Sequence, residues 1–290
     1  MKNILVPTDF SAESHYAFEV ALMLARRTGG TVTLLHVLEV PEATTGNFST
    51  YGGPVNGSEL PNSESSIDRI FMIKLMEATK GRLHALKAEA QTLAAGVPVE
   101  DTVAVNRIGN GILTAIERHR TDVVVMGAQG HGAMENFFVS STTERLIRLA
   151  PCPVLTVKHQ QAQFEVRTIV FPSDFTTEAV GAIAGLQRVH ATFPNAVVHL
   201  LHVVSGTDSL TTQQHQRAFA HQAQLTNFQT GVITADSTSA GIEQYAKQVE
   251  ADLVVLPTHA RSGLSRFLQT SIAETVATHA FPPVLTYHLA

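Results

Sequence analysis

A glycine-containing loop followed by paired serines is the place in this sequence best suited to chemistry. Gly127 and Gly130 follow a short apolar run, and nine residues later come Ser140, Ser141 and Thr142. Glycines let backbone amides approach an anion closely, and a helix N-terminus adds unpaired N–H groups and a favourable dipole. The spacing therefore indicates a cradle for a phosphate-like anion.

The same serines also have a purely structural interpretation. Ser141 begins a capping-box pattern that ends at Glu144, and Ser271 begins the same pattern ending at Glu274. In such a box the serine hydroxyl accepts a backbone N–H of the first helical turn and needs no ligand. From residue spacing alone, the anion cradle and the helix cap stay open as equal alternatives.

Other reactive side chains favour structural roles. Cys152 lies between two prolines without a second cysteine, so we expect a packing residue rather than a nucleophile. His199 and His202 are three apart on a predicted strand and should point to opposite faces, which is wrong for one metal ion. His131 in the glycine loop is expected to be an exposed loop side chain. No lysine occurs in 127–142, so any phosphoryl transfer should be slow.

The elements that must position the loop occur twice along the chain. Similar segments recur in the same order and at nearly constant separation: Ile4–Ser11 with Ile169–Thr176, Leu34–Val37 with Leu200–Val203, Asp122–Met126 with Asp252–Leu256, and Pro153–Thr156 with Pro283–Thr286. An internal repeat of this length predicts two similar domains. We assign the first domain to 1–158, a polar linker to 159–165 and the second domain to 166–290. The first copy is longer, and its surplus falls in a polar, glycine-rich stretch that we interpret as an inserted loop at 39–67.

Strand and helix patterns alternate within each copy. Short apolar runs alternate with helical periodicity, including predicted helices over 68–93, 178–193 and 213–228, and a strand over 231–235. This order predicts the α/β class, with two Rossmann-like domains, each an open parallel five-stranded sheet with helices on both faces. Ligands of such sheets bind beyond the carboxyl ends of the strands.

Composition narrows the range of partners. The 290 residues are 44% hydrophobic and carry a formal net charge of −5 without a basic stripe, so nucleic acid is not an expected partner. The apolar runs are too short to span a bilayer, so no membrane association is expected either. A single cysteine and an N-terminus without a signal-peptide pattern favour the cytoplasm.

Both copies resemble the universal stress protein (UspA-like) family. The resemblance is carried by the opening strand with Pro7, Thr8 and Asp9, by the Leu-His-Val strand, and by Ala-Pro-Cys-Pro-Val-Leu at 150–155. It implies a fold similar to the adenine nucleotide alpha hydrolases and, for the family's ATP-binding branch, a pattern of Gly, two residues, Gly, nine residues, Gly, then Ser or Thr. This chain has Gly127 and Gly130, but Ser140 stands in place of the third glycine.

The resemblance also implies a ligand and its contacts. The ligand is ATP accompanied by Mg²⁺. The residues implied to bind it are Pro7, Thr8 and Asp9 at adenine and ribose, the Val37 backbone at adenine, and Gly127, Gly130, Ser140, Ser141 and Thr142 at ribose and phosphates. The second copy has Pro257 and Ala260 at the first two glycine positions, so we expect its nucleotide loop to be degenerate.

Three hypotheses follow for function. The first is a stress-response protein in which ATP binding to the first domain acts as a regulatory switch. The second is a scaffold of the same fold that binds no nucleotide, and the third, weaker one is a slow ATPase. Because family members associate through their last strands, the resemblance also implies that the two copies pair within one chain as a pseudo-two-fold dimer. Whether two chains form a homodimer stays open.

Overall fold

The computed structural model describes residues 1–39, 63–128, 139–204, 210–258 and 272–289. Its strands are β1 (Asn3–Pro7), β2 (Thr31–Leu38), β3 (Val99–Val105), β4 (Val123–Gly127), β5 (Val154–Val157), β6 (Thr168–Pro172), β7 (Val197–Val204), β8 (Phe228–Thr234), β9 (Leu253–Thr258) and β10 (Val284–His288). Its helices are α1 (Ala12–Thr28), α2 (Ser63–Leu93), α3 (Ile108–Arg118), α4 (Val139–Leu149), the 3₁₀ helix η2 (Thr177–Ala182), α5 (Ile183–Thr192), α6 (Leu210–Gln222), α7 (Thr238–Gln248) and α8 (Ile272–His279).

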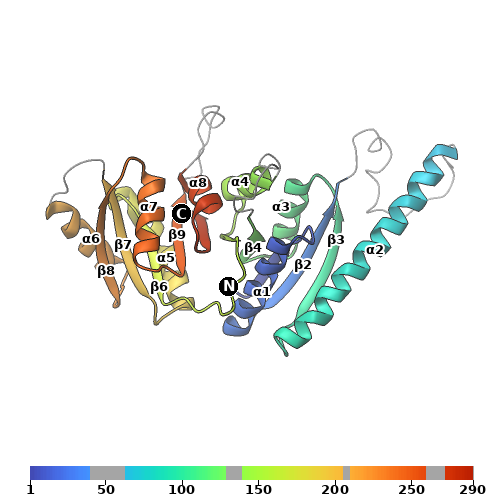
Figure 1. Ribbon diagram of the computed structural model, residues 1–290, viewed down its shortest axis with the longest axis horizontal. Coiled ribbons are helices and arrows are strands. Elements are labelled where there is room, and N and C mark those ends of the chain that lie inside the picture. The colour runs from blue at the N-terminus through green and yellow to red at the C-terminus, as the bar shows by residue number, and fades with distance from the viewer. Residues whose placement is uncertain (40–62, 129–138, 205–209, 259–271, 290) are drawn as a thin grey trace.

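These strands form one continuous sheet in the order β3-β2-β1-β4-β5-β10-β9-β6-β7-β8 (Figure 1). All neighbours within each half are parallel, whereas β5 and β10 pair antiparallel with Leu155 opposite Leu285. The predicted five-stranded parallel domains and their pairing through the last strands are therefore confirmed. The parallel order follows from the alternation of strands and crossover helices, and the antiparallel joint follows from pairing two similar edge strands about a local two-fold axis.

Helices cover both faces of the sheet, as predicted. In β1, Ile4 and Val6 pack with α1 and α2 in one core cluster, whereas Leu5 packs with α3 and α4 in another. The alternation follows from the two-residue period of a strand. Both faces of this central strand are buried, which explains why its sequence is a continuous apolar run.

Helix α1 begins at a serine cap and ends at a glycine. The Ser11 hydroxyl accepts the Ser14 N–H at the N-terminus, and Gly29 ends the helix with a left-handed φ of 65°. The apolar residues that recur three and four positions apart along this helix are all buried: Ala17, Val20, Ala21, Leu24 and Ala25. Local capping and hydrophobic periodicity therefore determine this helix.

Three predicted elements need correction. The helix predicted over 178–193 is divided into η2 and α5, and the helix predicted over 213–228 ends at Gln222, because Phe228 already belongs to strand β8. Phe228 pairs with Val198 of β7. This pairing between distant parts of the chain decides its conformation, and helical periodicity alone does not reveal it. Of the proposed inserted loop 39–67, residues 40–62 lie outside the described residues and 63–67 form the start of α2. Part of the surplus length is thus helix, since α2 has 31 residues and α6 has 13.

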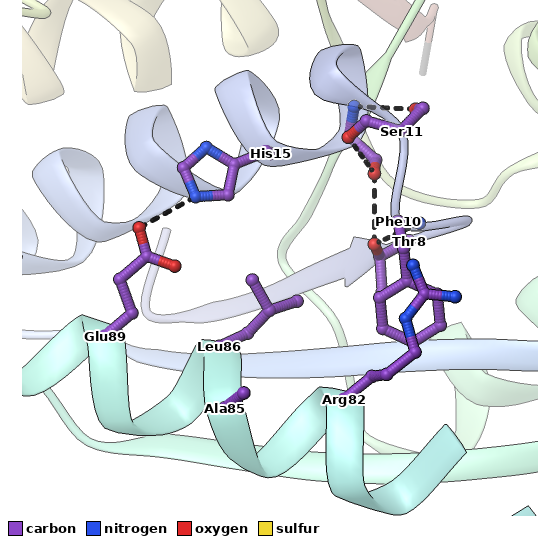
Figure 2. Close-up of a pocket in the computed structure, with 9 residues that line it drawn as sticks. Thr8, Phe10, Ser11, His15, Arg82, Ala85, Leu86 and Glu89 are labelled. Atoms are coloured by element: carbon purple, nitrogen blue, oxygen red, sulfur yellow. Dashed lines mark hydrogen bonds and ion pairs between the residues drawn. The ribbon is translucent and has the colours of Figure 1, made fainter. Parts of the chain in front are cut away.

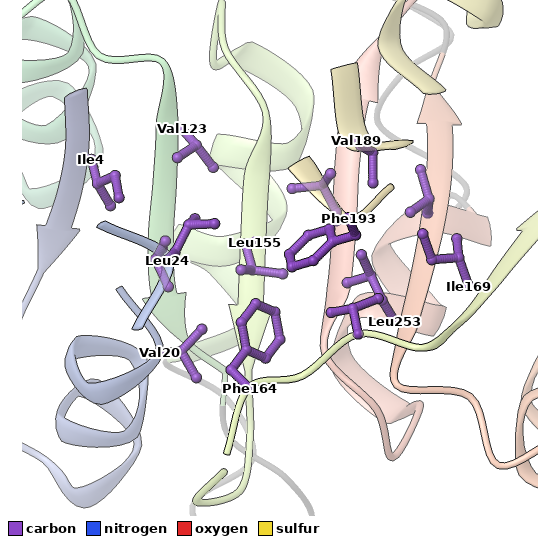
Figure 3. Packing of buried hydrophobic residues seen from close by; sticks show 14 of the residues in the cluster. Ile4, Val20, Leu24, Val123, Leu155, Phe164, Ile169, Val189, Phe193 and Leu253 are labelled. Atoms are coloured by element: carbon purple, nitrogen blue, oxygen red, sulfur yellow. The ribbon is translucent and has the colours of Figure 1, made fainter. Parts of the chain in front are cut away.

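A shared core joins the two halves. Leu155 and Leu285 of the central strands belong to the same buried cluster as Phe164, which precedes β6, and Phe193, which follows α5 (Figure 3). The Phe164 and Phe193 rings meet edge to face at 5.8 Å between centroids. The chain segment between the domains is therefore anchored by its own aromatic side chain.

Polar contacts add to this joint. Arg148 of α4 pairs with the buried Glu274 of α8 at 2.8 Å, and Arg148 also lies 3.6 Å from Glu144. Burial and the neighbouring Glu274 carboxylate raise the pKa of Glu144 above its ordinary value. Lys158, which follows β5, is buried and donates to the carbonyls of Val276 and Ala280 at the end of α8. Within the described residues, none of the helices combines the length and apolar character needed to cross a membrane.

Candidate functional site

The carboxyl ends of β1, β2 and β4 meet at one edge of the first domain. β1 lies between the other two, pairing with β2 from Asn3 to Pro7 and with β4 at Ile4 and Leu5. This edge is where the strand order changes direction, the usual ligand position in such sheets. Among the predicted residues, it brings together the strand ends that carry Pro7, Val37 and Gly127.

Val37 offers open backbone groups at this edge. The Thr8 N–H donates to the Leu35 carbonyl at 2.8 Å, so this residue of β2 directs its backbone polar groups toward β1. In a parallel strand, the residue two positions later directs its N–H and C=O to the same side. β1 ends at Pro7, and in the described part of the chain no strand pairs with Val37 on that side. Its N–H and C=O are therefore suited to a planar ligand with adjacent acceptor and donor groups.

Thr8 is engaged inside the protein. Its buried hydroxyl accepts the Phe10 N–H and lies 3.0 Å from the Ser14 hydroxyl, and its carbonyl lies 2.7 Å from His36 Nδ1. These contacts fix the turn between β1 and α1. Thr8 therefore stabilises the turn at this edge, and its hydroxyl is already bonded within the protein. Pro7, the last residue of β1, is half-buried.

Asp9 is exposed and precedes the N-cap of α1. Its carboxylate accepts both the backbone N–H of Ser11, at 2.9 Å, and the Ser11 hydroxyl, at 2.5 Å. Partial burial by itself raises the pKa of Asp9, but the hydrogen bonds from Ser11 and Ser14 together outweigh it and leave the pKa below its ordinary value. Asp174 accepts the same pair of hydrogen bonds from Thr176 in the second domain. Each aspartate therefore holds the N-cap residue of the helix that follows it, and each retains a second carboxylate oxygen.

Gly127 is required by packing alone. A Cβ built at this position would lie 2.6 Å from the backbone carbonyl carbon of Glu13 and 2.7 Å from the backbone nitrogen of Ser14. The end of β4 thus rests directly against the first turn of α1. This close approach brings the peptide that leads into the glycine loop beside the N-terminus of α1.

The remaining cradle residues are placed in part. Gly130 lies outside the described residues, whereas the backbone of Ser140 and Ser141 forms the first turn of α4 and Thr142 follows half-buried. Since α4 begins at Val139, Ser141 is the third helical residue and its interpretation as the N-cap is wrong. Backbone N–H groups of a first helical turn have no partner within the helix, which keeps the anion interpretation open.

A pocket that the sequence did not suggest lies between α1 and α2. It has a volume of about 270 Å³, and Thr8, which follows β1, forms part of its wall (Figure 2). Its walls are Thr8, Phe10, Ser11, Ser14, His15, Arg82, Ala85, Leu86 and Glu89. The available signal was the spacing of Arg82, Ala85, Leu86 and Glu89, which puts them on one face of a helix. Nothing in the sequence indicated that α1 would face them.

The other candidates keep structural roles. His199 contacts the hydroxyl of Tyr245 on α7 and His202 contacts the carbonyl of Ser173, so the two histidines do face opposite sides of β7. Burial raises the pKa of Cys152 to about 11, which keeps the thiol protonated at neutral pH. Among the described residues, no three or more His, Cys, Asp or Glu side chains are grouped so that they could hold a metal ion. His131, Ala260 and Ser271 lie outside the described residues.

The sequence of the chain matches one protein family along most of its length. The model of the universal stress protein family matches residues 1–158 and 165–288. Among similar curated proteins, a universal stress protein of Methanocaldococcus jannaschii is 27% identical over 161 residues, which are 56% of this chain and 97% of that protein. Another from Thermus aquaticus is 32% identical over 159 residues, which are 54% of this chain and 98% of that protein.

A solved structure supports the arrangement of the whole fold. The crystal structure of a universal stress protein from Archaeoglobus fulgidus has a TM-score of 0.73 to this chain at 16% sequence identity, covering 99% of this chain and 96% of that one. At this level of identity the likeness concerns the fold. It extends across both halves of the ten-stranded sheet.

Proposed function

The chain belongs to the universal stress protein family as a tandem two-domain member, and from this premise we propose that its first domain binds an adenine nucleotide at the carboxyl ends of β1, β2 and β4. The observation that carries the proposal is the open backbone of Val37 beyond the end of β1. A backbone N–H and C=O that face one side fit the donor and acceptor edge of adenine. The free oxygen of Asp9 is suited to accept a ribose hydroxyl.

The anionic part of the ligand would extend toward α4. Its first turn contains Ser140 and Ser141, and the N–H groups of a first helical turn have no partner within their own helix. The Gly127 peptide leads into the glycine loop at the same edge. If the nucleotide is ATP, Mg²⁺ would accompany its phosphates and neutralise part of their charge. The role that we propose is a stress-response switch, in which nucleotide occupancy favours one arrangement of the segments around the edge.

Nucleotide binding can be tested with matched substitutions in the two copies. MgATP at about 100 times its Kd should stabilise the wild-type protein by about 2.7 kcal/mol, measured as a thermal shift. Gly130→Asp puts a negative charge where the proposal places phosphate and should abolish the shift. Ala260→Asp, at the corresponding position of the second copy, should leave the shift unchanged.

The remaining hypotheses are outcomes of the same experiment. No shift of the wild-type protein at millimolar MgATP supports the scaffold that binds no nucleotide. Loss of the shift with Ala260→Asp but not with Gly130→Asp places the nucleotide in the second domain and contradicts the proposal. Radiolabelled phosphate release at about 1 s⁻¹ or faster, a rate common among enzymes, would instead support an ATPase.

A further inference from the structure

The pocket between α1 and α2 has its own arrangement of charge. Arg82, Ala85, Leu86 and Glu89 are spaced along one face of α2 and form its floor (Figure 2). The first and last of these lie two helical turns apart, about 10 Å along the axis. The floor therefore has a cation at one end, an apolar middle, and a carboxylate at the other end.

At the cationic end, the exposed Arg82 side chain places its guanidinium over the Phe10 ring. Its central carbon lies 3.9 Å from the centroid of the Phe10 ring, and that ring also contacts the His36 ring, at 4.7 Å between centroids. Stacking uses the face of a guanidinium and leaves the N–H groups along its edge available. Among the described residues, Arg82 forms no ion pair with a carboxylate. A planar anion in the pocket would find there a preorganised partner for two parallel hydrogen bonds.

At the other end, Glu89 is half-buried. One of its oxygens lies 2.9 Å from His15 Nε2, and His15 Nδ1 lies 3.7 Å from Glu19. Two carboxylates thus surround one imidazole, and the second oxygen of Glu89 remains for another donor. This end of the pocket favours a cation.

The hydroxyl groups of the wall are already used within the protein. Ser11 donates to Asp9, Ser14 donates to the Ser11 carbonyl, and Thr8 is bonded to Phe10 and Ser14. A ligand therefore obtains its main polar contacts at the two ends. Between them, Leu86 and the methyl group of Ala85 offer only apolar surface.

The second domain has different residues at the corresponding positions. By the shared strand register, Val180 stands at the position of His15, Ala218 at that of Glu89, and Phe219 at that of Ala90. Phe219 stacks on Phe171 at 5.5 Å and meets Phe175 edge to face at 5.4 Å. The second domain therefore forms the same fold with an aromatic cluster in this part of its core. The charged residues of the first-domain pocket are not needed to form the fold.

We propose that the α1–α2 pocket is a binding site for an extended, small ω-amino carboxylate. The carboxylate pairs with the edge of Arg82, the methylene chain lies on Leu86 and Ala85, and the ammonium group donates to Glu89. The volume of about 270 Å³ is at the small end of ligand pockets and suits a molecule of this size. The contacts proposed here are made by α2, whereas those proposed for the nucleotide lie at the strand ends and on α4, so this inference does not rest on the proposed function.

The test uses 6-aminohexanoate as the probe and two truncated controls on the full-length chain. Isothermal titration calorimetry should detect saturable binding at or below about 10 mM, with hexanoate and hexylamine each binding at least about fivefold more weakly. Arg82→Gln and Glu89→Gln should each weaken binding of 6-aminohexanoate about fivefold. The matched controls Arg118→Gln and Glu117→Gln remove the same charges from the exposed end of α3 and should leave it unchanged.

A filling variant tests the location. Ala85 is exposed, so Ala85→Leu should preserve folding while placing a larger apolar side chain in the pocket, and it should abolish binding. Absence of binding at about 10 mM overturns the proposal. So does binding that survives Ala85→Leu, or equal affinity for hexanoate, hexylamine and 6-aminohexanoate. Because no nucleotide is present, none of these results bears on the proposed nucleotide site.

Discussion

The two domains share one backbone frame but fill the space beside the first helix differently. Ile4 pairs with Val123 in the first domain as Ile169 pairs with Leu253 in the second, so the strands are in equivalent register. Beside this common frame, the first domain has a pocket with charged ends, and the second has an aromatic cluster around Phe219.

The difference shows that strand pairing and pocket formation depend on different residues. The apolar strand residues that determine the sheet are alike in both copies. The residues that differ are on α1 and α2, where His15 and Glu89 correspond to Val180 and Ala218. A repeat can therefore keep its fold while only one copy keeps polar groups available to a ligand.

The largest expected effect comes from removing the aromatic core of the second domain. Phe219 is 4% exposed and contacts Phe171 and Phe175. Phe219→Ala should lower the free energy of unfolding by about 3–5 kcal/mol, because a large cavity remains. Urea denaturation measures this loss. Leu86→Ala, at the half-buried wall of the first-domain pocket, is the control and should cost clearly less. Equal losses would show that the two regions are packed alike.

The second effect is a pH dependence of stability that arises from a lysine at the end of β5, where the second domain carries a histidine at the end of β10. Burial lowers the pKa of Lys158 from 10.5 to about 8, although Glu243 opposes the shift. The unfolded chain therefore binds more protons between pH 8 and 10.5, and the free energy of unfolding should rise with pH across this range, by up to about 3 kcal/mol. His288, the corresponding residue at the end of β10, contacts Thr258 of its own domain instead.

Lys158→Met isolates this contribution. The variant cannot titrate at this position, so its unfolding free energy should lack the part of the rise that wild type shows above pH 8. Urea denaturation at a series of pH values measures both proteins. Parallel pH profiles would mean that Lys158 has the same pKa in the folded and unfolded chain.

A third, smaller effect concerns the ends of β4 and β9. Gly127→Ala forces a Cβ against the backbone of Glu13 and Ser14 and should cost about 1–3 kcal/mol. Gly81→Ala is the control, since a Cβ there has no neighbour within 4 Å and alanine favours a helix by up to about 1 kcal/mol. The second domain carries Pro257 at the equivalent position, where the corresponding helix begins as the 3₁₀ helix η2. A Gly127→Ala protein with the same free energy of unfolding as the wild type would contradict the close packing of β4 on α1.

The smallest effect compares the two capping aspartates. Because the pKa of Asp9 is lowered in the folded state, its contribution is present above its ordinary pKa and is lost as pH falls through the lowered value. Since Asp9 is exposed, Asp9→Asn should cost less than about 1 kcal/mol at neutral pH by thermal denaturation. If Asp9 also binds ribose, Asp9→Asn should weaken MgATP binding and Asp174→Asn should not. Equal ATP affinity in both variants would limit Asp9 to capping.

Local signals in the sequence predicted much of the fold. The Ser11 cap, the glycine stop after Thr28 and the alternation of apolar runs specify α1 and the strands, since each depends on neighbours within a few residues. The helix predicted through Phe228 failed because pairing of that residue with β7 overrides local periodicity. The strand ends around Val37 were expected from the topology and the resemblance, whereas the α1–α2 pocket was not expected at all.

By itself, the sequence determined the repeat, the parallel order within each domain and the family, because these follow from periodicity and recurring motifs. Only the tertiary structure decided that Gly127 is needed for packing against α1, that Phe164 anchors the segment between the domains, and that Arg82 and Glu89 face α1 across a pocket. The physical reason is that side-chain volume acts between residues distant along the chain. At equivalent positions of α2 and α6 the copies carry Ala90 and Phe219, and this difference in side-chain volume leaves the strand pairing of both copies intact.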